Sequence, residues 1–148
     1  MMFIKSALMI AGCAVSSSAI AKEINISCTM NKSNTTTTNP ILDQRINSQN
    51  KISIRRYIFD DSTKNAWILI NGEKRELCQE SEGCSFQYSQ SLISRQVRNQ
   101  KENSNLSIDR ISGSISEDFA MLDANGRTVM FMTFAGDCKS EAGIRPKF

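Results

Sequence analysis

The first 21 residues constrain this chain most, because they decide the redox conditions under which the rest of it folds. Lys5 gives a basic start, residues 7–15 form an apolar core, and Ala19-Ile20-Ala21 is a small-x-small cleavage site. This pattern predicts a secretory signal peptide over residues 1–21 and a single mature domain over residues 22–148. Export to an oxidising compartment favours disulfides over catalytic thiols or metal-binding cysteines.

A second interpretation of the same segment is a lipoprotein signal. Ile10-Ala11-Gly12-Cys13 resembles a bacterial lipobox, in which Cys13 would carry the lipid and tether the domain to a membrane. The apolar stretch before Cys13 is short for such a signal, so we favour cleavage after Ala21. No later run approaches the ~20 apolar residues of a membrane-spanning helix. The predicted location is therefore the periplasm or the cell exterior.

Four cysteines follow the signal segment, and four cysteines allow three pairings. Cys78 and Cys84 enclose a short polar segment that contains a glycine able to turn the chain, so a local bridge is sterically easy. Cys28 would then pair with Cys138 and bring the first strand to the last. We favour this nested pairing, and the sequence leaves the other two pairings open.

Short alternating apolar runs separated by turn residues predict an all-β domain. Residues 24–30 alternate apolar and polar side chains, residues 52–58 alternate around isoleucine, and Asn71-Gly72 is a strong type I′ turn signal. No window has the periodicity of an apolar helical face. We expect residues 31–40 to form a loop, with an edge strand over Thr35 to Thr38 as the alternative. The prediction is an antiparallel meander of about eight strands, stapled by disulfides, that forms a small barrel or a sandwich.

The residue types restrict the possible chemistry. The chain has no histidine, the side chain best suited to proton transfer near neutral pH and the commonest metal ligand. Carboxylate pairs remain, at Asp60-Asp61, at Glu80 with Glu82, and at Glu117-Asp118, and each also fits a turn, a polar loop or a solvated strand. We therefore expect a protein that is not an enzyme and has no cofactor or metal. The net charge of only +3, with scattered basic residues, argues against a nucleic-acid partner.

Two surfaces are candidates for binding. The loop Glu80-Ser81-Glu82-Gly83 is acidic and bridged at both ends, so it is preorganised in the way that an inhibitory loop requires. Trp67, Met130 and Met132 are candidates for an apolar ligand surface, because methionine adapts its shape to a partner. The alternatives are a plain structural loop for the first and core packing for the second.

Two short motifs, Ile108-Asp109-Arg110-Ile111-Ser112-Gly113 and Gly136-Asp137-Cys138, occur together with the export signal. In these features the chain resembles small exported β-proteins of Gram-negative bacteria whose function is not known. The resemblance implies a periplasmic β domain with a late cysteine, and it implies no catalytic residue or ligand.

The leading functional hypothesis is a non-enzymatic binding protein whose partner is a protein of the periplasm or cell envelope. It would act as an inhibitor or immunity-type protein that occludes a secreted or cell-wall enzyme. A small β-barrel that binds an apolar ligand is the first alternative. A carboxylate-based cell-wall hydrolase is the second.

Overall fold

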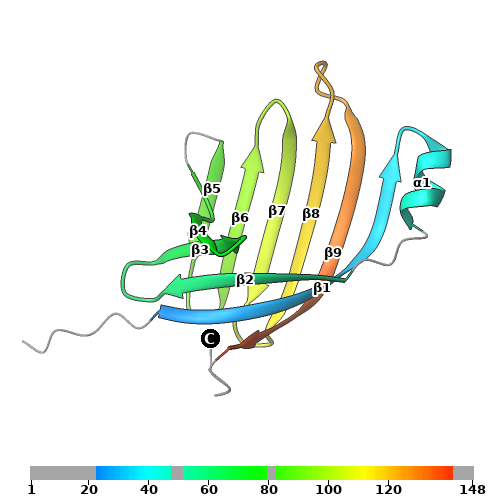
Figure 1. The fold of residues 1–148 in the computed structure, drawn as a ribbon. Coiled ribbons are helices and arrows are strands. Elements are labelled where there is room, and N and C mark those ends of the chain that lie inside the picture. Colours follow the sequence, from blue (N-terminus) through cyan, green and yellow to red (C-terminus); the bar gives the residue numbers. More distant parts are fainter. Residues whose placement is uncertain (1–22, 48–51, 80–82, 142–148) are drawn as a thin grey trace, which may run out of the picture.

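The computed structural model describes residues 23–47, 52–79 and 83–141. In these three ranges, nine strands form one antiparallel sheet, and one helix lies beside it (Figure 1). The predicted signal peptide and Cys13 lie outside the described residues. In chain order the elements are β1 (Glu23–Thr37), α1 (Pro40–Asn47), β2 (Ile52–Asp60), β3 (Asn65–Ile70), β4 (Glu73–Glu76), β5 (Cys84–Tyr88), β6 (Leu92–Arg98), β7 (Glu102–Asp109), β8 (Ser114–Leu122) and β9 (Thr128–Ser140).

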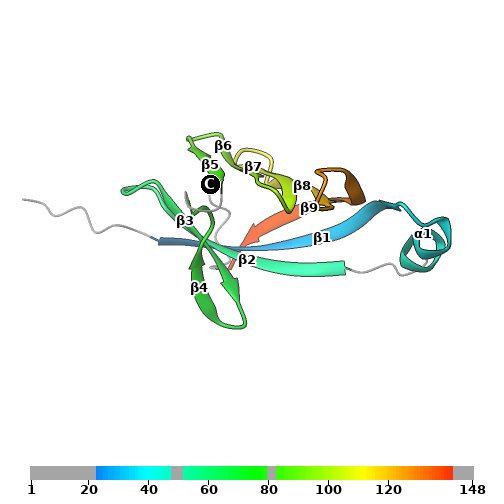
Figure 2. The ribbon, with the colours of Figure 1, turned by 90° about the horizontal axis from the view of Figure 1, so that it is seen from above.

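The sheet is a meander whose first and last strands pair with each other. Its strand order is β4-β3-β2-β1-β9-β8-β7-β6-β5, so β4 and β5 form the two edges. The sheet curls into a half-barrel, and Figure 2 shows β1 and β2 on one side of it and β5 to β8 on the other. The predicted all-β antiparallel meander with disulfide staples is confirmed. Of the two predicted forms, barrel or sandwich, the sheet is nearer to a barrel, because it curls into half of one.

The core fills the inside of the curled sheet. Along β1, Ile26, Cys28 and Met30 are buried, whereas Asn25 and Thr29, at alternate positions, are exposed, as the alternation predicts. Both walls of the half-barrel contribute to one apolar cluster. Its buried members are Ile26, Cys28, Met30, Tyr57, Phe59, Ala66, Leu77, Ile93, Leu106, Ile108, Ile115 and Cys138.

β1 extends further than the sequence predicts. The expected loop at residues 31–40 is wrong for its first part, because β1 continues to Thr37 and pairs there with β9. The register shifts between Lys32 and Asn34, close to the point where the pairing of β1 with β2 ends at Asn31. The threonines that follow are β-branched, and they favour an extended strand once a neighbouring strand supplies the hydrogen bonds.

The helix α1 begins immediately after β1 and packs beside its final residues. The side-chain oxygen of Asn39 accepts the backbone N–H of Ile41 at 3.0 Å, as a helix N-cap does. Pro40 takes the first helical position, where its missing N–H has no cost. Thr37 donates its backbone N–H to the Asp43 carboxylate, so the helix satisfies part of the β1 edge that β2 leaves free.

Both predicted disulfides are present. Cys28 and Cys138 are directly opposite each other on β1 and β9, and their bridge lies in the core. Cys78 and Cys84 join the end of the β4 segment to the start of β5. Two disulfides fit a protein that folds outside the cytoplasm. None of the described residues belongs to a helix of the length and apolarity needed to cross a bilayer.

Candidate functional site

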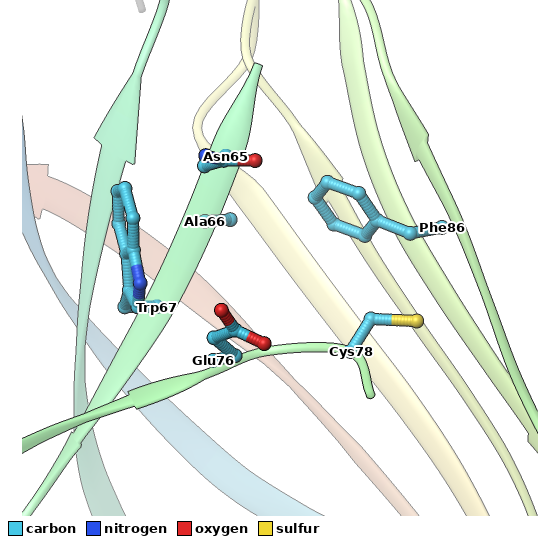
Figure 3. Close-up of a pocket in the computed structure, with 6 residues that line it drawn as sticks. All are labelled: Asn65, Ala66, Trp67, Glu76, Cys78 and Phe86. Atoms are coloured by element: carbon cyan, nitrogen blue, oxygen red, sulfur yellow. The ribbon is translucent and has the colours of Figure 1, made fainter. Parts of the chain in front are cut away.

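A small cavity lies between β3 and β5. Trp67 is one of the residues that line it, and one face of the Trp67 ring is covered by the Lys74 ammonium group, 3.8 Å from the ring centroid. Ligand pockets commonly enclose about 300–1,000 Å³, and this cavity is much smaller. It has a volume of about 110 Å³ and is lined by Asn65, Ala66, Trp67, Glu76, Cys78 and Phe86 (Figure 3).

The structure separates the three residues that we predicted as an apolar ligand surface. Trp67 pairs with Ile58 on β2, and this row of the sheet faces away from the core. Met130 and Met132 alternate along β9 in phase with the buried Cys138, so they lie on the inner face. Trp67 therefore lies on the outer face of the sheet, and the two methionines belong to the inside of the half-barrel.

The inner side of β8 and β9 stays apolar beyond the buried core. Met132 pairs with Phe119, and Met130 pairs with Met121. Along β8 the side chains become more exposed in one direction, from Ile115 at 2% to Met121 at 42%. We call this partly exposed surface the inner apolar face, and its members are Phe119, Met121, Met130, Met132 and Phe134.

A buried charged cluster lies between the core and the inner apolar face. Glu117 of β8, with its side chain 8% exposed, forms ion pairs with Arg55 of β2 and, at 3.5 Å, with Arg95 of β6. Arg95 also donates to the Ser104 hydroxyl at 3.1 Å. The Arg55 guanidinium lies 5.4 Å from the centroid of the Phe134 ring. The cluster thus connects β2 to β6 across the interior, although four strands separate them in the sheet.

Two hydrogen-bond donors of this cluster have no acceptor among the described residues. They are the Tyr57 hydroxyl and Nε of Arg95, and both atoms are buried. Burial raises the pKa of the Tyr57 hydroxyl, so this group keeps its proton at neutral pH and remains a donor. A buried polar group without a partner costs about 1–3 kcal/mol. The cluster is therefore a place where an acceptor from outside the chain would be stabilised.

A second ion-pair cluster closes the other end of the half-barrel. Arg110, only 3% exposed, pairs with the Asp61 carboxylate at 2.9 Å and donates to the Ser89 carbonyl at 2.9 Å. The Tyr88 hydroxyl donates to the same carboxylate at 2.7 Å. These bonds connect the turn after β2 to the segments that follow β5 and β7. Arg110, a member of the first short motif in the sequence, holds these turns together.

The first carboxylate pair has a structural role. Asp60 accepts hydrogen bonds from the hydroxyl and backbone N–H of Ser62, which lower its pKa to about 2. The hydrogen bond from Arg110 likewise lowers the pKa of Asp61. A general acid at neutral pH needs a raised pKa, and both carboxyls depart in the opposite direction.

Of the other two predicted acidic pairs, the structure describes only Glu117 and Asp118. Glu117 and Asp118 are neighbours on β8, so their side chains point to opposite faces, one buried and one exposed. Glu80 and Glu82 lie outside the described residues. Within the described ranges, no three or more acidic or cysteine side chains gather in a way that could hold a metal ion.

Of the predicted loop Glu80-Ser81-Glu82-Gly83, the structure describes only Gly83. Its φ is +69°, and its carbonyl accepts the backbone N–H of Arg98 at 3.0 Å. A Cβ at this position would lie 2.4 Å from the Arg98 carbonyl oxygen, so the turn requires glycine. The loop is thus anchored to β6 at its end, as well as by the disulfide.

Sequence reasoning missed the two arginines of the buried cluster. A signal for one of them was present, because Arg95 stands between Ile93 and Val97 at every second position of β6. Glu117 stands in the same way between Ile115 and Phe119. A charge in the apolar register of a strand indicates a group that must find a partner inside the fold.

Comparisons of this chain with known protein families, with curated proteins and with solved structures found no match. The geometry of the half-barrel is therefore the basis on which a function can be proposed. Its two distinctive elements are the inner apolar face and the charged cluster at its base.

Proposed function

We propose that this protein is an exported, non-enzymatic binding protein of the periplasm that holds an apolar ligand against the inner face of its half-barrel. The observation that carries this proposal is the row of phenylalanine and methionine side chains on β8 and β9. They face inward, where burial would be expected, yet Met121 remains 42% exposed. An apolar surface that the fold leaves uncovered indicates a binding site.

The residue types of the inner apolar face suit a ligand. Met130 and Met132 have flexible, polarisable side chains that adapt to irregular apolar shapes. Phe119 and Phe134 supply large apolar area with few rotatable bonds. Both strands belong to the interior of a continuous sheet, so the backbone beneath these side chains is held on both sides. Such preorganisation lowers the entropic cost of binding.

The other two hypotheses have less support. Inhibition of an enzyme through the loop at residues 80–83 stays a prediction, and the Cys78–Cys84 disulfide that brackets the loop is the observation in its favour. The hydrolase hypothesis also stays a prediction. The acidic pairs in the described part of the chain offer it no support, because their members point apart or are held in turns.

Titration with a neutral apolar fluorophore, N-phenyl-1-naphthylamine, tests the proposal. The wild-type protein should give a saturable rise in fluorescence, and Phe119→Gln should weaken binding about tenfold, the equivalent of removing one buried aromatic contact. Phe131→Gln is the matched control, because Phe131 lies on the outer face of β9 and is also partly exposed. Absence of binding to the wild type, or equal loss in both variants, would contradict the proposal.

A further inference from the structure

We propose that the ligand is a single-chain lipid carboxylate, with its head group at the cluster of Arg55, Arg95 and Tyr57 and its chain along the inner apolar face. This inference rests on the proposed function and adds the chemistry of the ligand. It draws on three separate observations about the cluster: its charge, its unpaired donors and its position.

The charge of the cluster fits one monoanion. Arg55 and Arg95 contribute two positive charges, and Glu117, which pairs with both, contributes one negative charge. One positive charge is thus left uncompensated among groups that are about three-quarters or more buried. An uncompensated charge away from water is costly, and a ligand with a single negative charge would balance it. A dianionic head group would reverse the imbalance instead of removing it.

The unpaired donors fit the two oxygens of a carboxylate. Nε of Arg95 and the Tyr57 hydroxyl are buried and lack an acceptor, while Tyr57 as a whole is only 1% exposed. The Tyr57 hydroxyl is near enough to interact electrostatically with Arg55, Arg95 and Glu117. A carboxylate only accepts hydrogen bonds, and it can take one from each donor. Hydrogen bonds of this charge-assisted kind are stronger than neutral ones.

The position of the cluster fits an amphipathic molecule. On the inner face of β8, the buried Ile115 precedes Glu117, and Phe119 and Met121 follow it. Glu117 also pairs with Phe134 on β9, which belongs to the inner apolar face. From Glu117 to Met121 the strand rises by about 13 Å. A head group at the cluster therefore directs an alkyl chain of medium length over Phe119 and Met132 toward the more exposed end.

Isothermal titration calorimetry of the purified, disulfide-bonded protein with decanoate and decan-1-ol tests this inference. Decanoate should bind about ten- to a hundredfold more tightly than the alcohol, because only the carboxylate gains the charge-assisted hydrogen bonds. Arg95→Gln should remove this preference by weakening decanoate binding much more than decan-1-ol binding, because only the carboxylate loses a charge-assisted hydrogen bond. Arg98→Gln is the matched control, since it removes the same charge from an exposed position of the same strand.

A second variant separates ligand binding from a purely structural role. Tyr57→Phe deletes a hydroxyl whose proton has no acceptor within the described chain and whose oxygen interacts with Arg55, so the fold should persist. We expect it to weaken decanoate binding severalfold and decan-1-ol binding less, because a neutral hydroxyl accepts a weaker hydrogen bond than a carboxylate does. Tyr88→Phe, which removes a hydroxyl at the other end of the half-barrel, should change neither affinity.

The outcomes distinguish this inference from the proposed function. If neither decanoate nor decan-1-ol binds, the proposed function itself fails. If both bind with equal affinity, the apolar site stands and the carboxylate inference is overturned. Equal loss of preference in Arg95→Gln and Arg98→Gln would also overturn it. Dimers that form through the inner apolar face and ignore decanoate would assign this face to a second copy of the chain instead.

Discussion

The half-barrel has two junctions that join its first four strands to its last five, and they differ in how they are held. At the first, β1 and β9 pair from Ile26 to Thr37, and the Cys28–Cys138 disulfide lies within this ladder. At the second, β4 and β5 are the unpaired edges of the sheet, and the Cys78–Cys84 disulfide joins the segments beside them. A disulfide therefore reinforces hydrogen bonding at one junction and substitutes for it at the other.

The residues of β4 explain why the second junction stays open. Glu73, Lys74, Arg75 and Glu76 are all exposed, so this strand has no apolar side to bury against β5. Charged side chains on an edge strand also prevent pairing with other chains. The cavity beside Trp67 lies at this junction. The comparison shows that strand pairing follows the supply of apolar side chains, and that a covalent bond can hold two edges together without it.

The largest expected effect comes from breaking the first junction. Replacement of both Cys28 and Cys138 by alanine should lower the free energy of unfolding by about 4–5 kcal/mol, because this bridge closes a long loop in the unfolded chain. Alanine avoids placing a serine hydroxyl in the core. Urea denaturation followed by circular dichroism measures the change. A loss below that of the Cys78 and Cys84 double variant would contradict the ranking of the two junctions.

A smaller effect is expected from the cluster that connects β2 to β6 across the interior. Glu117→Gln should lower the free energy of unfolding by about 2–3 kcal/mol, because two arginines would keep their charges without a counterion. Asp118→Asn, at the exposed neighbouring position, provides the control and should change stability by less than about 0.5 kcal/mol. Equal effects would show that the ion pairs contribute nothing beyond surface charge.

Opening the second junction should have a comparable or slightly smaller effect. Replacement of Cys78 and Cys84 by alanine should lower the free energy of unfolding by about 2 kcal/mol, because the two cysteines are only six positions apart and the bridge closes a short loop. If this disulfide also positions the wall beside the cavity, amide hydrogen exchange in β4 and β5 should rise, while exchange in β1 and β9 stays slow. Faster exchange in all four strands would show that the two junctions are not independent.

The smallest effect concerns pH. The hydrogen bond from Arg110 lowers the folded-state pKa of Asp61, so its stabilisation is complete above the unfolded value of about 3.9 and disappears as the pH falls through the lower folded value. Asp61→Asn should therefore cost about 1 kcal/mol at pH 7, a small amount because the Asp61 side chain is 47% exposed. Thermal unfolding should show the two proteins converging toward pH 2. A constant difference across this range would contradict the ion pair's role.

Local signals in the sequence correctly predict much of the fold. The Asn71-Gly72 turn has positive φ at both residues, 53° and 83°, as a type I′ turn requires. The alternation of β1 identifies its buried face, and the short spacing of Cys78 and Cys84 favours the disulfide pairing that the structure has. Each of these features depends on neighbouring residues or on steric limits, which the sequence contains directly.

The face that β2 buries could not be predicted from its alternation. Ile52 and Ile54 look like core residues, yet they are 67% and 68% exposed. The alternate positions of the strand, which include Arg55 and Tyr57, face the inside of the half-barrel instead. A period of two allows either face to be buried, and the choice depends on how neighbouring strands pair. For the same reason the candidate site could not be found from the sequence, because its arginines come from β2 and β6 and meet only when the sheet curls.

The sequence by itself thus determined the all-β class and the strongest turns of this protein, because short-range sterics and side-chain alternation specify them, and it favoured the nested disulfide pairing without excluding the other two. Only the tertiary structure decided that β1 continues through its threonines, that the sheet opens between β4 and β5, and that Glu117 lies between two arginines. These features depend on hydrogen bonds and charges contributed by residues far apart in the chain. These hydrogen bonds and ion pairs stabilise the fold only after the strands that carry them have paired.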